Sequence, residues 1–102
     1  MIHVIAKIKT VAGKRAAFLA EFHKLVPLVL AEVGCVQYGP TVDANTGIDG
    51  QLLVGEDTVV VIEQWESVAA LKDHLVADHM NAYRETVKDL VVDLQLEVYE
   101  TA

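Results

Sequence analysis

Histidine and carboxylate side chains in the second half of the chain are the groups best suited to acid–base chemistry. His74 follows Leu71 by three residues in a segment with helical spacing of apolar residues, so its imidazole lies beside the apolar stripe. Such an imidazole can face a partly dry pocket and accept a proton, because its unperturbed pKa is about 6.5. The alternative is a boundary histidine held by one hydrogen bond.

Glu63 and Trp65 lie two residues apart in a predicted strand, so their side chains point to the same face of a sheet. A carboxylate beside Val61 and Trp65 is costly to bury unpaired. Glu63 is therefore predicted either to orient His74 or to meet a backbone N–H or an arginine. Trp65 is predicted either to form an aromatic wall for a planar substrate or to close the strand–helix junction as a core residue.

Two further residues are candidates for substrate binding. His79 precedes a second apolar stripe and is predicted to reach the same pocket, and Tyr38 can offer its hydroxyl to a substrate oxygen or pack within a strand. On one continuous helix, His74 and His79 would point about 140° apart, which does not suit chelation by an i,i+4 pair. Because cysteines and carboxylates at zinc-site spacing are also absent, the sequence predicts no metal site.

Composition excludes several classes of partner. Fifteen acidic residues against eight basic ones give a net charge of −7, which repels phosphate backbones and anionic membranes. No apolar run approaches the roughly 18–20 residues of a membrane span, and residues 1–4 lack the basic region of a signal peptide. The single cysteine, Cys35, fits a reducing compartment. We therefore expect a cytoplasmic protein with no nucleic-acid or membrane partner.

The apolar pattern along the 102 residues predicts one domain, 1–102, with alternating strands and helices. Helices are predicted between Gly13 and Gly34 and from residue 68 onward, with Ser67 as the N-cap of the latter and a second N-cap or a kink at Asp78. A turn or loop rich in Asp, Asn, Thr and Gly is predicted over 43–50, followed by a short strand extension over 51–54. The main strands are predicted over 2–9, 35–42, 58–65 and 94–99.

This β-α-β-β-α-β order is typical of an α+β ferredoxin-like fold, an antiparallel sheet with helices on one face. The strand over 58–65 is apolar on both faces, through four successive residues from Val59 to Ile62. The face without helices is therefore too apolar to be left in water. Pairing two sheets face to face would bury it, which predicts a homodimer in the form of a dimeric α+β barrel.

Two stretches of the chain resemble the antibiotic biosynthesis monooxygenase family. Residues 63–74 contain Glu-x-Trp-x-Ser followed by Ala-Leu and a histidine, with His79 soon after, and residues 31–38 are similar to the family's Glu-x-Gly-Cys-x-x-Tyr. The resemblance covers nearly the whole chain in matching order. It implies a dimeric ferredoxin-like barrel with a pocket between sheet and helices in each subunit. In the oxygenase branch, O₂ reacts directly with an electron-rich phenolic substrate, without flavin or metal.

The resulting hypothesis is a cofactor-independent monooxygenase that acts on a quinol-like or polyphenolic aromatic substrate with O₂. Its predicted catalytic residues are His74 and Glu63, and its predicted substrate-binding residues are Trp65, Tyr38 and His79. The alternatives are an isomerase or tautomerase-like enzyme for a small carbonyl metabolite, and a non-catalytic dimeric binding module. The haem-degrading branch is disfavoured, because its relatives carry an asparagine in the first strand and residues 2–9 contain none.

Overall fold

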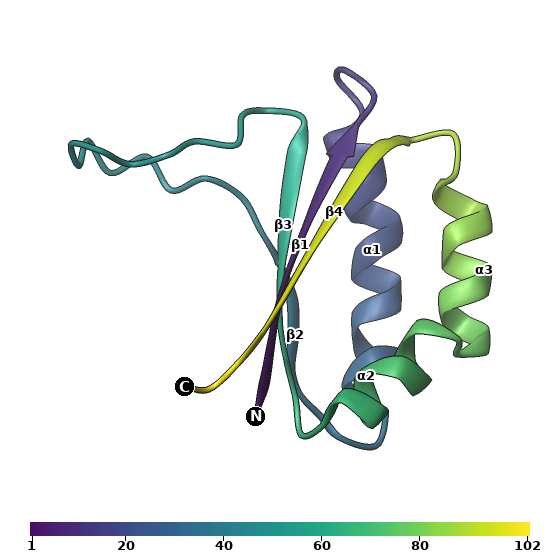
Figure 1. Cartoon of the computed structure of the whole chain (residues 1–102). Coiled ribbons are helices and arrows are strands. Elements are labelled where there is room, and N and C mark those ends of the chain that lie inside the picture. Colours follow the sequence, from purple (N-terminus) through teal and green to yellow (C-terminus); the bar gives the residue numbers. More distant parts are fainter.

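Strand β1 lies inside a four-stranded antiparallel sheet in the computed structural model, which describes residues 1–102. The strand order is β2-β3-β1-β4, and the three helices lie on one face of the sheet (Figure 1). This arrangement confirms the predicted ferredoxin-like α+β fold. The elements are β1 (Ile2–Thr10), α1 (Arg15–Leu30), β2 (Cys35–Thr41), β3 (Thr58–Trp65), α2 (Val68–Leu75), α3 (Asp78–Val87) and β4 (Val91–Glu100).

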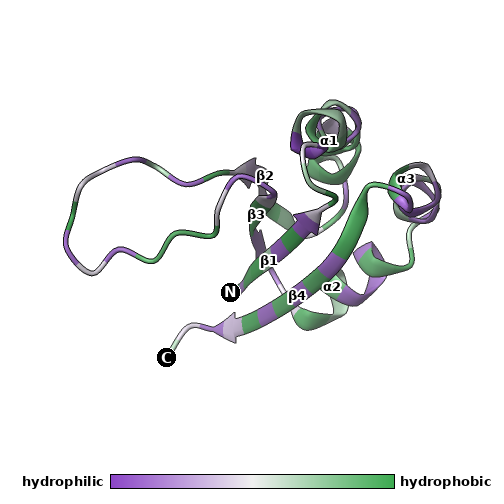
Figure 2. Ribbon diagram, turned by 90° about the horizontal axis from the view of Figure 1, so that it is seen from above, coloured by the Kyte–Doolittle hydropathy of each residue, from purple (hydrophilic) through white to green (hydrophobic).

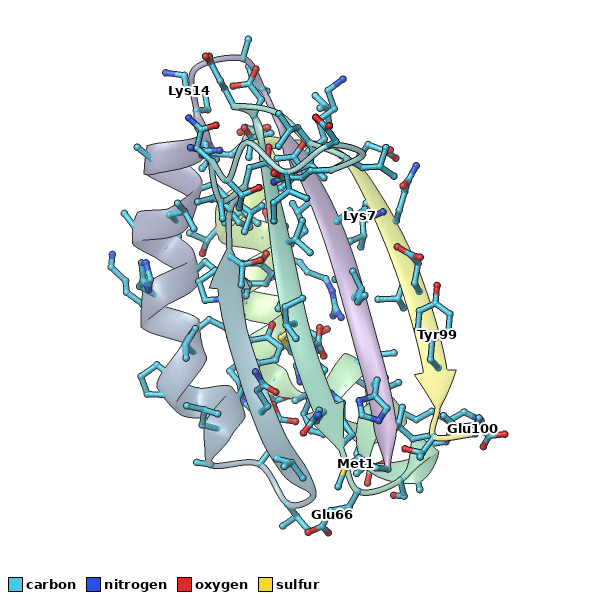
Figure 3. The ribbon with its side chains drawn as sticks, turned by 90° about the vertical axis from the view of Figure 1, so that its left-hand side faces the viewer. Met1, Lys7, Lys14, Glu66, Tyr99 and Glu100 are labelled. Carbon is cyan, nitrogen blue, oxygen red and sulfur yellow. The ribbon has the colours of Figure 1, made fainter.

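The two faces of the sheet differ in what covers them. Alternate residues of β1 and β3, including Val4 and Val61, face the helices and are almost completely buried. The opposite face, which we call the open face, carries no helix, as Figure 3 shows. At its centre lie Ile5 and its partner in register, Ile62, both half-buried. The alternation of hydrophobic and hydrophilic residues along β1 and β4 is visible in Figure 2.

Helix α1 packs on the sheet through one stripe of apolar residues. Its four buried residues, Phe18, Phe22, Leu25 and Val29, are at most 4% exposed. The helix ends at Leu30, and the chain turns back into β2 through Gly34, which adopts a φ of +85°. A Cβ at Gly34 would lie 2.6 Å from the Cβ of Ala70 in α2, so glycine lets this turn lie directly against α2.

The helical segment after β3 is broken into two helices. Ser67 caps α2 by accepting a hydrogen bond from the backbone N–H of Ala70 at 3.1 Å, as the sequence predicts. Helix α2 ends at Leu75, and α3 begins only at Asp78. His74 and His79 therefore lie on different helices, so the spacing argument against their convergence, which assumed one continuous helix, is wrong.

Residues 42–57, which we call the arm, extend away from the sheet and the helices (Figure 1). The predicted short strand over 51–54 is wrong, because no strand forms there. The carboxylate of Asp43 accepts hydrogen bonds from the backbone N–H groups of Val54 (3.0 Å) and Gly55 (2.9 Å), which closes the base of the arm. None of the three helices is long and apolar enough to cross a membrane.

Candidate active site

A cavity of about 340 Å³ lies between the helix-covered face of the sheet and α3. The cavity stays open because α3 packs beside α1 and leaves edge strand β4 partly uncovered. Two β4 residues, Leu94 and Leu96, are 57% and 47% exposed. Most of the lining is apolar, and it includes Ala6, Ile8, Phe22, Val61, Met80, Tyr83 and Val87. A volume of this size is typical of a small-molecule site.

Glu63 is the carboxyl group in the cavity wall. Its side chain is 5% exposed, and its Oε1 accepts a hydrogen bond from the indole N–H of Trp65 at 2.9 Å. Burial is the main cause that raises the pKa of Glu63 to about 7; the hydrogen bond from Trp65 opposes the shift, and the charge of Glu32 adds to it. Both protonation states of this carboxyl are therefore accessible near neutral pH, as a general acid–base group requires.

Tyr38 lies opposite Glu63 in the register of β2 and β3 and also lines the cavity. Its ring stacks on Phe22 at a centroid separation of 5.6 Å, and its side chain is 6% exposed. Burial, with the charge of Glu63 as a second cause, raises the pKa of the Tyr38 hydroxyl well above its usual range. The hydroxyl is therefore neutral near pH 7 and can donate a hydrogen bond to a cavity ligand.

Trp65 and His74 lie behind the cavity wall rather than in it. Neither side chain lines the cavity, and they are 0% and 2% exposed. Their rings pack together with centroids 4.6 Å apart, so Trp65 occupies the core position that one of its two interpretations predicts. Burial lowers the pKa of His74, and its hydrogen bond to Glu32 opposes that shift.

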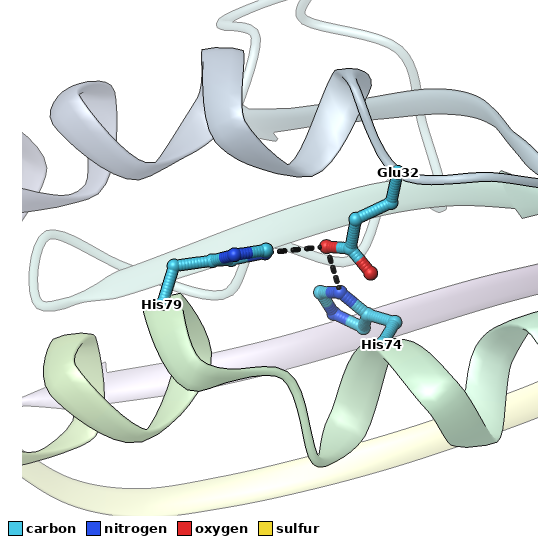
Figure 4. A group of neighbouring side chains, drawn as sticks. All are labelled: Glu32, His74 and His79. Carbon is cyan, nitrogen blue, oxygen red and sulfur yellow. Dashed lines mark hydrogen bonds and ion pairs between the residues drawn. The ribbon is translucent and has the colours of Figure 1, made fainter.

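Three side chains from separate segments converge beside His74 (Figure 4). The Oε2 atom of Glu32, on the turn after α1, lies 2.8 Å from Nδ1 of His74 and 2.7 Å from Nε2 of His79. His79 faces a shallow depression between α1 and α3, not the cavity. Glu63 does not orient His74, because its hydrogen bond goes to Trp65.

Glu32 is the residue that sequence reasoning missed. It is separated from its two histidine partners by 42 and 47 positions, so no local pattern connects them. The available signal was its place in the Glu-x-Gly-Cys-x-x-Tyr stretch, which supplies Tyr38 as well.

Comparison with known proteins places the chain in a family. The model of the family described as antibiotic biosynthesis monooxygenase matches residues 1–86. A protein of Escherichia coli (strain K12) named probable quinol monooxygenase YgiN is 44% identical over 102 residues, covering 98% of this chain and 97% of the relative.

Solved structures share the fold of this chain. PA3566 from Pseudomonas aeruginosa has a TM-score of 0.79 at 26% identity, over 99% of this chain and 94% of that one. Rv0793 from Mycobacterium tuberculosis has the same TM-score at 25% identity, over 99% and 94% of the two chains. The chain therefore belongs to the antibiotic biosynthesis monooxygenase family.

Proposed function

We propose that this protein is a cofactor-independent monooxygenase that oxidises a small quinol-like or polyphenolic aromatic substrate with O₂. The observation that carries the proposal is a carboxyl group, Glu63, with a pKa of about 7 in the wall of an apolar cavity of about 340 Å³. Family membership and the name of the Escherichia coli relative, a probable quinol monooxygenase, support the same reaction class.

Glu63 acts as the base in this proposal. Its carboxylate takes the proton from a quinol hydroxyl, and the resulting quinolate is electron-rich enough to reduce O₂ in a dry site. Dioxygen then bonds to the ring carbon beside the deprotonated oxygen. Loss of the hydrogen on that carbon, together with cleavage of the O–O bond, leaves one oxygen on the ring and releases the other as water.

The substrate supplies every electron that this reaction needs. A quinol plus O₂ gives a hydroxyquinone plus water, so the four electrons that reduce O₂ all come from the ring, and no external reductant takes part. Proton transfers to and from the carboxyl of Glu63 also balance over one turnover. The neutral hydroxyl of Tyr38, opposite Glu63, donates a hydrogen bond to the quinolate oxygen as its charge develops.

The predicted catalytic role of His74 becomes a positioning role in this proposal. Its imidazole packs on Trp65, whose indole N–H holds the Glu63 carboxyl, and it does not line the cavity. Phe22, Met80 and Tyr83 provide the apolar surface against which a flat substrate packs.

The assembly that we propose is a homodimer formed through the open face. Ile5, Val60 and Ile62 lie on this face and are only half-buried within one chain. A second copy placed on the same face would cover them, in keeping with the two-fold contacts that most homodimers use.

The deciding experiment is turnover of a panel of quinols under ¹⁸O₂. We expect one O₂ consumed per quinol and a product that carries one ¹⁸O atom, with the second label in water. An unlabelled quinone accompanied by hydrogen peroxide would instead show simple oxidation. No O₂ uptake, together with proton exchange on a carbonyl compound detected by NMR, would favour the isomerase.

A further inference from the structure

The cluster of Glu32, His74 and His79 is a second group of chemically active side chains, separate from the cavity. None of the three lines the cavity. Their ligand atoms, one carboxylate oxygen and two ring nitrogens, all lie within 4.8 Å of one another. They come from the turn after α1, from α2 and from the first turn of α3, so tertiary packing alone brings them together (Figure 4).

Two features of the backbone produce this convergence. The break between α2 and α3 at residues 76–77 redirects His79 so that it points to the same place as His74. The absence of a side chain at Gly34 lets the turn that carries Glu32 close against Ala70. Both stretches that resemble the family therefore contribute to one constellation, at a site away from the proposed chemistry.

The hydrogen bonds show that both imidazoles aim at a single point. One oxygen, Oε2 of Glu32, accepts from Nδ1 of His74 and from Nε2 of His79, because a carboxylate oxygen can only accept. A cation seated between this oxygen and the two nitrogens would receive a lone pair from each nitrogen, and each ring proton would move to the other nitrogen of its imidazole. Two imidazoles and one carboxylate are donors that Zn²⁺ and related transition-metal ions prefer.

The geometry also leaves room for entry and for a further ligand. Zn–N bonds are about 2.0–2.1 Å long, so donors around a tetrahedral ion lie roughly 3.3 Å apart. The Glu32 oxygen and the two nitrogens, now 2.7 Å and 2.8 Å from it, must therefore move slightly apart to admit the ion. His79 can make this movement, because its side chain is 26% exposed at the start of α3, and Glu32 is 14% exposed. The same openness gives water access to a fourth position, and the net charge of −7 attracts cations.

We propose that Glu32, His74 and His79 form a binding site for a divalent transition-metal ion, with Zn²⁺ the ion that this donor set suits best. The bound ion fastens the turn after α1 to α2 and α3, and it lies outside the cavity. Because the ligands come together only in the folded chain, binding stabilises the folded state by mass action. Protons compete with the ion for the two imidazoles and the carboxylate, so affinity falls as the pH is lowered.

The test uses the full chain, stripped with EDTA and then titrated with Co²⁺ and Zn²⁺. We expect Co²⁺ to give the visible absorption of a four-coordinate ion, Zn²⁺ to displace it at a 1:1 ratio, and Zn²⁺ to raise the melting temperature. His79→Gln should weaken binding at least about tenfold and abolish the thermal shift. His23→Gln, which changes an exposed histidine of α1, is the matched control and should behave like the wild type.

Glu32→Gln is a second test of the same donor set, and its loss of affinity should match that of His79→Gln. If Glu32→Gln fails to fold, the comparison of His79→Gln with His23→Gln still decides. The proposal is overturned if the wild type binds neither ion at millimolar concentration. It is equally overturned if His79→Gln binds Co²⁺ with unchanged affinity and spectrum, since the ion would then sit elsewhere and the cluster would be a hydrogen-bonded network only.

Discussion

Replacing Glu63 with glutamine separates the chemistry of the cavity from its stability. Glutamine has nearly the same shape, and its amide oxygen can still accept the hydrogen bond that Trp65 donates at 2.9 Å. The substitution therefore removes the ionisable group and leaves the packing in place. We expect Glu63→Gln to be at least as stable as the wild type at neutral pH while losing most of its activity.

The size of the stability effect follows from the pKa. The carboxyl titrates at about 7 in the folded chain, against 4.5 for an unperturbed group. Each unit of difference corresponds to about 1.4 kcal/mol, so above pH 7 the buried charge costs roughly 3–4 kcal/mol of folding stability. Below 4.5 both states are protonated and the cost is absent. As the pH rises from 4.5 to 7, the unfolded chain releases its proton first, so the wild type loses stability over that interval relative to Glu63→Gln.

Urea denaturation at pH 5 and pH 8 measures this difference directly. Trp65 is the single tryptophan and is fully buried, so its fluorescence reports unfolding. Glu66→Gln, at an exposed position three residues away, is the control and should match the wild type at both values of pH. Equal dependence on pH in the wild type and Glu63→Gln would refute the raised pKa.

The kinetic half of the prediction uses quinol turnover. If Glu63 is the base, Glu63→Gln should lower the rate roughly 10²–10⁴-fold, and the wild-type rate should rise with pH through one ionisation near 7. That ionisation should be absent from the residual activity of the variant. Other titratable groups act on Glu63 or share its cavity: Glu32, Tyr38 and Cys35 interact with its charge, and Tyr83, Arg84 and Lys88 line the same cavity. A folded Glu63→Gln with undiminished turnover would remove Glu63 from the chemistry.

Three further outcomes follow from the structure. Turnover measured with an oxygen electrode should survive EDTA without added flavin, and a loss that one specific metal restores would contradict the cofactor-independent reaction. Ile62→Asp, on the open face, should yield folded monomers in analytical ultracentrifugation, whereas Val61→Asp, 1% exposed beneath the helices, should prevent folding. His74→Ala removes the packing on Trp65 and the hydrogen bond to Glu32, so urea denaturation should show that the free energy of unfolding falls by about 2–3 kcal/mol. An unchanged unfolding midpoint would show that the imidazole is dispensable for folding.

The strands were the most predictable part of the fold, because a period of two depends only on neighbouring residues. The predicted strand over 58–65 has the observed bounds of β3, and the shared face of Glu63 and Trp65 was predicted from their spacing. The extension over 51–54 failed because its backbone pairs with no strand. The sequence of the arm signals a turn but cannot show where the chain leaves the sheet.

The candidate site was predictable only where its contacts are local. Helix phase placed His74 at the margin of its stripe, yet the residue is 2% exposed because Trp65 and Tyr38 cover it. The position of its partner Glu32 depends on the contact of Gly34, in the turn after α1, with Ala70 of α2, which no periodicity encodes. The predicted angle between His74 and His79 holds only for one continuous helix. Residues 76–77 are not helical, so the two side chains point in different relative directions from those predicted.

The cavity and the exposed apolar surface have one cause. Three helices cover the sheet toward β2 and β3, and the helix-facing residues of edge strand β4 stay open: Leu94, Leu96 and Val98 are 46–57% exposed. Full coverage would bury this surface and remove the cavity, since Leu94 and Leu96 are part of its lining. Incomplete packing along β4 therefore keeps the cavity wall beside Glu63 accessible. Binding of an apolar substrate is favourable because it covers apolar surface that the fold leaves in water.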